Sequence, residues 1–387
     1  MESNETQTAA VAGMARDPAE VETAMRDLMC LTLVNGVGPN HFRSLVERFG
    51  SPAAVLGAPV DQLREVRGIG AALADRIVAA RRDSKVDYEL AECRGLGVRL
   101  IPAESPDFPA TLKTIHDPPA LLYVRGQLLP RDALGIAIVG SRHCTHYGVR
   151  TAERLASALT RMGFTIVSGL ARGIDGAAHR GAIHAGGRTI AVLASGVGNI
   201  YPPEHKDLAE QVVQHGALLS EMPTHFQPFA GLFPQRNRII SGLSLGVVVV
   251  EAAQRSGALV TANHAKEQNR EVLAVPGHID SLASRGCHAL LRDGATLVES
   301  ADDVVDALGP LMNEIRPNPD SSLRHPLELT LNDLERKLLG TVGGETITVD
   351  EIVERSQLPA AQVISALSVL EMRRLVRRLP GNQYARR

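Results

Sequence analysis

The sequence predicts an α/β domain of the doubly wound class, in which helices cover both faces of a mostly parallel sheet. Two continuous apolar runs, at 136–139 and 245–250, indicate strands that are buried on both faces. Segments of about 10–15 residues with helical spacing of their apolar positions separate these runs from similar neighbours. Strands that alternate with helices in this way are typical of βαβ units and a parallel sheet.

The elements of this series follow one another between residues 136 and 298. Strands are expected at 136–139, 165–167, 189–194, 217–220, 245–250, 271–275 and 295–298. Helices are expected at 147–162, 174–185, 203–215, 236–243, 258–269 and 287–293. The domain is predicted to span 83–309, with a Pro-rich lead-in at 83–133 that contains strand-like pieces at 97–101 and 120–124.

A smaller helical module precedes this domain. Residues 1–20 show no periodicity and are expected to form a disordered tail. Residues 21–82 form short amphipathic helices that follow two glycine turns, at 35–38 and 67–70. The pair resembles helix-hairpin-helix (SAM-like) units, whose turns present backbone N–H groups to a phosphate. A tight helix–helix turn that touches no nucleic acid is the alternative.

The C-terminal part is predicted to be a second small module behind a linker. Residues 310–328 are rich in Pro, Asn and Ser and are interpreted as the linker. Residues 329–387 carry helical patterns at 331–339, 349–355 and 359–373, followed by a hairpin around Gly381. This order resembles a winged helix. Its basic tail favours DNA contact, and protein contact is the alternative.

Composition excludes several classes of protein. The net charge of −2 gives no evidence for nucleic acid, so such a function must rest on local clusters. Four scattered Cys without a CxxC pair argue against a disulfide framework and a zinc ribbon. The chain has no HExxH pattern and no Gly-rich Lys-Ser/Thr loop for ATP, and we expect neither a metal nor a cofactor. With no apolar leader and no membrane-length apolar stretch, the expected location is cytoplasmic.

Loops rich in Gly, Ser and Arg follow the strands where a ligand would bind. Gly140, Ser141 and Arg142 end the first strand, and free N–H groups there favour an anion. The Gly-x-Gly-x-x-Gly fingerprint is absent, so a dinucleotide site is poorly supported. The second strand leads into 168–173, which supplies Ser168, Gly169, Arg172 and Gly173 to the set. Carboxyl ends of parallel strands meet on one edge of a sheet, so these loops can form one groove.

A third loop combines cations with aromatic rings. Arg236, Asn237 and Arg238 stand at the expected start of a helix, where a bound anion would offset the unfavourable helix dipole. Phe226, Phe229 and Phe233 precede them, and at most one is expected to be exposed. Arginines for phosphates and aromatic faces for bases are what single-strand recognition requires. Ser256 and Gly257 follow the 245–250 strand on the same edge.

These motifs, in this order, resemble the DNA-processing protein A (DprA/Smf) family. The resemblance covers about residues 100–300 and rests on the Gly-Ser-Arg motif at 140–142, the segment 168–175, Tyr201-Pro202, Ser220-Glu221, the loop 233–238, Glu251-Ala252, 256–259 and Pro276-Gly277. It implies a non-catalytic protein with a Rossmann-like domain that binds single-stranded DNA, loads the RecA recombinase during natural transformation, and forms a homodimer through that domain.

The resemblance and the residue patterns together give one predicted DNA-binding site, without catalytic or metal residues. Its members are Gly140, Ser141, Arg142, Ser168, Gly169, Arg172, Gly173, Phe233, Arg236, Asn237, Arg238, Ser256 and Gly257. One departure from the family pattern is His288, where Asn is usual, in a segment that is thought to lie near the dimer contact.

An enzyme is the alternative function. The predicted core is similar to that of lysine-decarboxylase-like phosphoribohydrolases, which cleave nucleoside monophosphates. Their Pro-Gly-Gly-x-Gly-Thr-x-x-Glu signature is missing, because Pro276-Gly277 continues as His278-Ile279-Asp280. Asp175, Glu221 and Glu251 are candidate acids, and catalytic carboxylates usually work in pairs or with an oriented partner.

Overall fold

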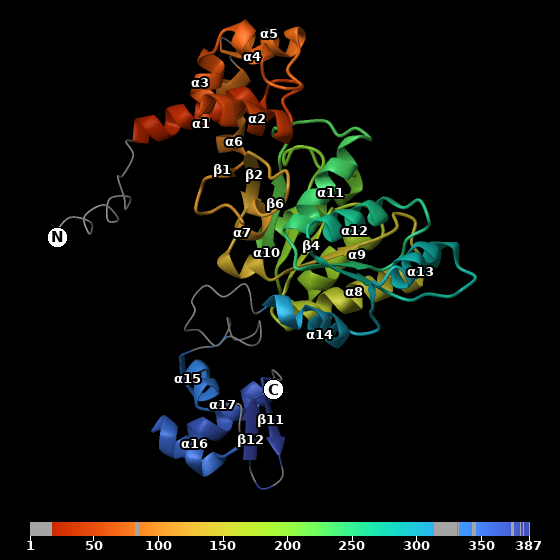
Figure 1. Ribbon diagram of the computed structural model, residues 1–387. Coiled ribbons are helices and arrows are strands. Elements are labelled where there is room, and N and C mark those ends of the chain that lie inside the picture. The colour runs from red at the N-terminus through yellow and green to blue at the C-terminus, as the bar shows by residue number, and fades with distance from the viewer. Residues whose placement is uncertain are drawn as a thin grey trace, which may run out of the picture.

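The computed structural model describes residues 18–81, 85–312, 331, 333–342, 346–372, 375–379, 381 and 383–386. Figure 1 shows three parts in chain order: a helical module, a large α/β domain and a small C-terminal module. This confirms the predicted fold class. Residues 1–17 of the predicted tail and 313–328 of the predicted linker lie outside the described residues. Two predicted bounds are corrected: residues 18–20 belong to helix α1, Pro18–Thr32, and residues 310–312 to helix α14, Ala301–Met312.

A nine-stranded sheet forms the centre of the α/β domain, in the order β1-β2-β6-β5-β4-β3-β7-β8-β9. β1 pairs antiparallel with β2, and β2 with β6, whereas the remaining pairs are parallel. The strands are β1 Val98–Pro102, β2 Leu121–Gly126, β3 Gly135–Val139, β4 Thr165–Ser168, β5 Thr189–Val192, β6 Gly216–Ser220, β7 Gly246–Val249, β8 Glu271–Ala274 and β9 Thr296–Leu297.

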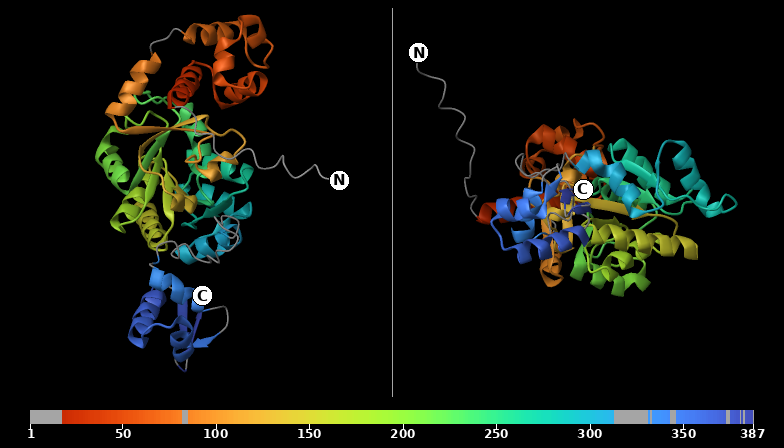
Figure 2. Two further views of the ribbon diagram at one scale, coloured as in Figure 1. Left: turned by 90° about the vertical axis from the view of Figure 1, so that its left-hand side faces the viewer. Right: turned by 90° about the horizontal axis from the view of Figure 1, so that it is seen from below.

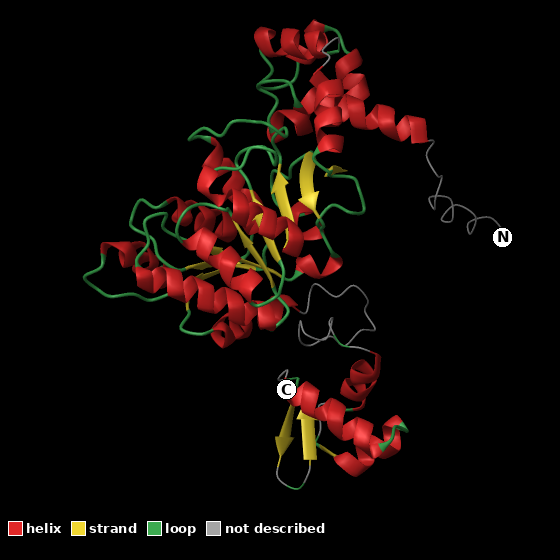
Figure 3. Ribbon diagram, turned by 180° about the vertical axis from the view of Figure 1, so that it is seen from behind, coloured by secondary structure: helices red, strands yellow, loops and turns green. Residues whose placement is uncertain are grey.

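Helices cover both faces of this sheet (Figure 3). They are α7 Ala110–Lys113, α8 His146–Arg161, α9 Ile174–His184, α10 Lys206–His215, α11 Leu232–Gly242, α12 Gly257–Glu267, α13 Arg285–Arg292 and α14 Ala301–Met312, with short 3-10 turns at Pro130–Ala133, Pro203–His205 and Leu282–Ser284. Ile136 and Ile138 pack with α8, α9 and α14, whereas Ala137 and Val139 pack with α11, α12 and α13. Successive strand residues face opposite layers, which is why the apolar runs do not alternate with polar residues.

The lead-in is more regular than its Pro-rich sequence indicates. Residues that we expected to form part of a connector contain helix α6, Lys85–Gly95, and the strands β1 and β2 extend the main sheet. α6 belongs to the N-terminal helical layer with α1 Pro18–Thr32, α2 Pro39–Phe49, α3 Pro52–Gly57, α4 Val60–Arg64 and α5 Ala71–Ala80. This layer contacts the α/β domain: the Thr224 amide donates to Glu89 of α6 at 2.6 Å, and Arg43 donates to the His116 carbonyl.

The two glycine turns of the helical module pack against side chains of each other's helices. Arg76, in α5, donates to the Asn35 carbonyl of the first turn at 2.9 Å. His41, in α2, contacts the Gly36 carbonyl at 2.9 Å, and a side chain at Gly68 would lie 2.9 Å from its ring. Both turns therefore stabilise the tandem itself, and phosphate binding by their N–H groups stays a prediction.

The C-terminal module has its own apolar core and a three-stranded sheet in the order β10-β12-β11. Its elements are α15 Asp333–Thr341, β10 Ile347–Thr348, α16 Val349–Ser356, α17 Ala360–Met372, β11 Val376–Leu379 and β12 Gln383–Arg386. Three helices followed by a hairpin form the predicted winged helix. α17 contains no Arg or Lys, whereas the hairpin carries exposed Arg377. Figure 2 shows this module beyond the α14 end of the α/β domain.

Candidate nucleic-acid interface

Loops at the carboxyl ends of β3, β4 and β5 meet α11 around a narrow hollow. Open parallel sheets bind ligands at this edge, where the backbone N–H groups are free. Five predicted site residues line it, together with Tyr201 and five neighbouring residues. The lining residues are Arg142, Gly169, Ala171, Arg172, Ala194, Ser195, Tyr201, Pro202, Pro228, Phe233 and Arg236.

A cation and two aromatic rings stand together at the mouth of the hollow. The Arg142 guanidinium lies over the Phe233 ring, 4.6 Å from its centroid. Tyr201 approaches the same ring at 5.8 Å between centroids, with the planes tilted by 54°. Tyr201 is 39% exposed, and Phe229, in the loop before α11, is 57% exposed. An exposed arginine beside accessible ring faces can bind a phosphate and its base together.

Arg236 forms the floor of the hollow. Its side chain is buried, and Nη1 donates to the carbonyls of Gly169 and Val192, while Nε is buried without a partner. Burial lowers the pKa of Arg236 to about 10, and the nearby Asp175 opposes that shift. A side chain at Gly169 would collide with the guanidinium, so glycine there lets Arg236 reach the floor. The floor therefore carries a positive charge that the backbone only partly satisfies.

Arg172 reaches the hollow from the loop after β4. It forms an ion pair with Glu204, and both side chains are about half exposed. The hydrogen bond to Glu204 raises the pKa of Arg172, and the same bond lowers the pKa of Glu204. A phosphate at this position has to compete with Glu204 for the guanidinium.

The glycine loops hold Arg142 in place. The Ser141 amide donates to the Glu251 carbonyl at 2.7 Å, and the Ser141 carbonyl accepts from Ile174 at 3.3 Å. Gly173 caps α9 with a φ of +74°, and a side chain there would collide with the Ser141 carbonyl. A side chain at Gly140 would likewise meet Ile174. These three residues shape the backbone behind the hollow and do not line it.

Three predicted site residues lie in the interior, which corrects the expectation that they face a ligand. The Ser168 hydroxyl donates to the Ile138 carbonyl at 2.6 Å, and Asn237 donates to the Gly257 carbonyl at 3.2 Å. Arg238 is only 4% exposed and pairs with Glu221 and with Asp117, the latter at 3.1 Å. The cause is the start of α11: the helix begins at Leu232 and not at Arg236, so Arg238 lies in its second turn.

Ser256 and Gly257 lie at the same edge of the sheet, outside the hollow. Ser256 caps α12, and its hydroxyl accepts the Ala258 amide at 3.3 Å. A side chain at Gly257 would extend into open space. Both positions follow β7, and their place in a DNA-binding site stays a prediction.

The three candidate acids of the enzyme alternative are engaged in structural contacts. Glu251 accepts from the amide and hydroxyl of Thr145, at 2.9 and 2.6 Å, and thereby fixes the start of α8. Asp175 accepts from the amides of Gly169 and Ala171, and Glu221 pairs with Arg238. Burial raises the pKa of Asp175 and of Glu221. Among the described residues, no three His, Cys, Asp or Glu side chains gather as metal ligands.

Sequence reasoning missed Tyr201 as a lining residue. It follows β5 at the same edge of the sheet, and its neighbour Pro202 also lines the hollow. The prediction placed aromatic contacts only in the loop before α11. In that loop one ring, Phe229, is strongly exposed, as expected. The available signal was an aromatic residue beside proline in the loop that follows a buried strand.

Comparison with known proteins finds three matching family models. The model described as DNA recombination-mediator protein A matches residues 99–309. A DprA winged helix domain matches residues 323–382, and a SAM-like helix-hairpin-helix tandem matches residues 30–83. No helix within the described parts of the chain is long and apolar enough to cross a bilayer.

Relatives cover nearly the whole chain. Protein Smf of Synechocystis is 36% identical over 92% of this chain and 96% of its own length. The crystal structure of DNA processing protein A from Streptococcus pneumoniae is 32% identical and covers 76% of this chain and 98% of its own, with a TM-score of 0.63. A single-stranded DNA binding mode is described for DNA processing protein A of Helicobacter pylori, which is 28% identical over 56% of this chain and 97% of its own; its TM-score of 0.49 is too low for a comparison of sites.

Proposed function

The chain belongs to the DNA recombination-mediator protein A family, and from this premise we propose that it binds single-stranded DNA at the rim hollow. One observation carries the proposal: Arg142, Arg172 and Arg236 converge with Phe233 and Tyr201 on one hollow at the carboxyl edge of the sheet. Arginines that contact phosphates fix the position of a strand without reading its sequence. Aromatic faces accept any base, so the site is suited to unpaired strands of mixed sequence.

A salt series with a matched pair of variants tests this assignment. Arg142→Glu should abolish binding of labelled oligo-dT, because it places a carboxylate beside the phosphates. Arg131→Glu is the control: Arg131 is also exposed, but it precedes β3 and lies at the opposite edge of the sheet. If Arg142→Glu bound oligo-dT with the parental affinity at low salt, the hollow would not be the site.

We also propose that the protein passes the bound strand to the RecA recombinase. This step would take place in the cytoplasm, during DNA-mediated transformation and recombination. Family membership and the arginine-lined hollow at the rim of the sheet support it. The test is single-strand-dependent ATP hydrolysis by RecA, whose lag should shorten when the chain is added. If the lag were equal with the parent and with Arg142→Glu, the RecA proposal would be overturned and the DNA-binding proposal would stand.

We also propose a homodimer through the α/β domain. Large apolar side chains are exposed near the β9 edge: Ile279 is 79% exposed, Leu282 65% and Leu297 46%. His288, in α13, contacts the Gly277 carbonyl at 3.1 Å beside them. Exposed apolar clusters of this kind favour association between protein surfaces. Light scattering should give twice the chain mass for the parent and the chain mass for an Ile279→Asp, Leu282→Asp variant.

The function proposed is binding without catalysis. Its support is that Asp175, Glu221 and Glu251 each hold structural partners, and that none of the three lines the hollow. Incubation with AMP or CMP, followed by an assay for free ribose phosphate, tests this directly. Robust turnover would favour the nucleotide-hydrolysing alternative.

A further inference from the structure

A second, wider groove lies on the outer side of α8, beside α9. Its volume is about 710 Å³, and it is lined by His146, Tyr147, Arg150, Thr151, Glu153, Arg154, Ser157, Gly181 and His184. Gly181 allows the close crossing of the two helices, because a side chain there would collide with the Glu153 carbonyl. None of these nine residues belongs to the rim hollow.

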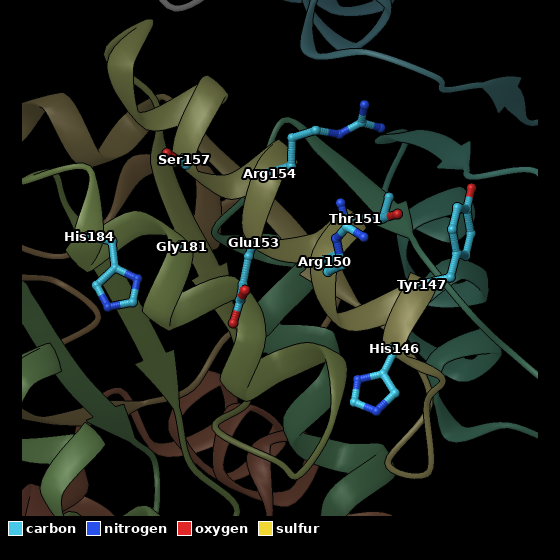
Figure 4. Close-up of a pocket in the computed structure, with 9 residues that line it drawn as sticks. All are labelled: His146, Tyr147, Arg150, Thr151, Glu153, Arg154, Ser157, Gly181 and His184. Atoms are coloured by element: carbon cyan, nitrogen blue, oxygen red, sulfur yellow. The ribbon is translucent and has the colours of Figure 1, made fainter.

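Three of these residues form a face suited to an unpaired strand. Tyr147, Arg150 and Arg154 are spaced i, i+3 and i+7, which places them on one side of a helix. Figure 4 shows the Tyr147 ring and the Arg154 side chain extending from the same side of α8, with Arg150 between them. Along the helix axis, Tyr147 and Arg154 are about 10 Å apart at 1.5 Å per residue.

Contacts at both ends hold this face in place and leave it accessible. The Tyr147 hydroxyl donates to the Pro276 carbonyl at 3.1 Å, yet the residue is 51% exposed. Arg154 donates to the backbone carbonyl of Glu299 at 3.2 Å. Because a carbonyl is neutral, this hydrogen bond does not neutralise the charge of Arg154. Arg150 is exposed. A fixed aromatic face costs little ordering when a base stacks on it.

The charge of the groove is positive. Glu153 is the only carboxylate among the nine lining residues, and Arg180 lies 3.6 Å from it. That pair is neutral and leaves Arg150 and Arg154 as uncompensated cations of the lining. Arginines next to an exposed aromatic ring are the combination that single-strand sites use.

The groove begins at the edge of the sheet that carries the rim hollow. α8 starts at His146, four residues after Arg142, and its cap Thr145 is held by the buried Glu251. Pro276, which anchors Tyr147, follows β8 at that same edge. A strand that leaves the hollow past Arg142 therefore reaches Tyr147 next.

We propose that this α8 face binds a second segment of the same single strand, with phosphates on Arg150 and Arg154 and a base on Tyr147. The inference rests on the proposed function of the hollow and deepens it, because it makes the site longer than the hollow alone. An acidic protein surface is the competing occupant, and the continuity with the hollow favours DNA over it.

Oligonucleotides of two lengths separate the groove from the hollow. A strand of about six nucleotides is long enough to cross the rim at the hollow, whereas one of about twenty also reaches the groove. The Arg150→Glu, Arg154→Glu variant should bind the long strand roughly tenfold more weakly, with a salt slope lower by about 1.4, which is two phosphates at about 0.7 each. It should bind the short strand as the parent does, and its mass by light scattering should be unchanged.

The outcomes distinguish the two hypotheses. Arg142→Glu should bind neither strand. If it bound both strands as the parent does, the hollow would not be the site, and the groove proposal, which rests on the hollow, would fall with it. If the Arg150→Glu, Arg154→Glu variant kept the parental affinity and salt slope for the long strand while Arg142→Glu lost binding, the groove proposal would be overturned and the hollow would stand. Arg131→Glu is the charge-matched control for both lengths.

A fluorescence experiment tests the stacking contact separately. The chain contains no Trp, so Tyr147→Trp and Phe233→Trp each create a single reporter. The short strand should quench only the reporter at 233, and the long strand should quench both. Tyr88→Trp, at an exposed tyrosine of α6, is the control that neither strand should quench. A reporter at 147 that responds like the one at 88 would contradict the proposal.

Discussion

The Arg142 guanidinium lies 4.6 Å from the centroid of the Phe233 ring, and this contact joins the loop after β3 to the first turn of α11. The two residues come from opposite layers of the domain, because α8 follows the first loop and α11 covers the other face. Their contact places a phosphate-binding cation beside a base-stacking ring. The two roles are separable by measurement, since only one of them depends on salt.

Phe233→Leu should weaken oligo-dT binding by about 1–3 kcal/mol, the usual cost of losing one stacked base. The slope of log affinity against log salt should stay unchanged, because no phosphate contact is lost. Arg142→Gln should instead lower that slope by about 0.7. Fluorescence anisotropy across a salt series measures both quantities, and equal slopes in the two variants would show that the roles are not divided in this way.

Arg238→Met should destabilise the domain by about 3–5 kcal/mol, because it leaves the buried carboxylate of Glu221 without its partner. Adding Glu221→Gln should recover part of that loss, since the unpaired charge is then removed. Urea denaturation followed by circular dichroism measures both effects. Arg131→Met, at an exposed arginine, should change stability by at most about 0.5 kcal/mol. A stable Arg238→Met protein that no longer binds DNA would return Arg238 to the interface.

The order and type of the strands and helices between residues 135 and 298 were predictable, because strands buried on both faces leave continuous apolar runs. The helices α6, α7 and α14, which flank this series, were not predicted. The start of α11 was not predicted either. Pro234 lies in its first turn, where proline is tolerated, and the sequence alone reads as a loop up to Arg236. The burial of Arg238 also depends on Asp117 and Glu221, which other loops supply. The residue types at the strand ends predicted which edge of the sheet carries the candidate site. Which of these residues line the hollow and which support its backbone depends on tertiary contacts that the sequence does not show.

Gly169→Ala should reduce oligo-dT affinity and destabilise the domain, because the added methyl group collides with the Arg236 guanidinium on the floor of the hollow. A core overlap of this kind typically costs about 1–3 kcal/mol. Gly257→Ala is the matched control: the new methyl group meets nothing within 4 Å, at the first position of α12. It should be neutral or slightly stabilising. If Gly257→Ala impaired binding as much as Gly169→Ala, the strand would run closely over the start of α12.

His179 should make the stability of the α/β domain depend on pH. Its ring is fully buried, and Nδ1 lies 2.7 Å from the Thr189 hydroxyl. That hydroxyl donates to the Ile166 carbonyl, so Nδ1 is the donor to it, and Nε2 is left buried without a partner. Burial lowers the pKa of His179 from 6.5 to about 3, which keeps the folded ring neutral.

Between these two pKa values the unfolded chain binds a proton at His179 that the folded chain does not, so stability falls as the pH is lowered through 6.5 toward 3. At pH 5.5 the loss from this one group is about 1.4 kcal/mol relative to pH 7.5. His179→Gln should show a pH-dependent loss that is smaller by this amount, measured by urea denaturation at both pH values, whereas the exposed His116→Gln should behave as the parent does. An identical loss in parent and His179→Gln would mean that the buried ring takes up its proton without unfolding.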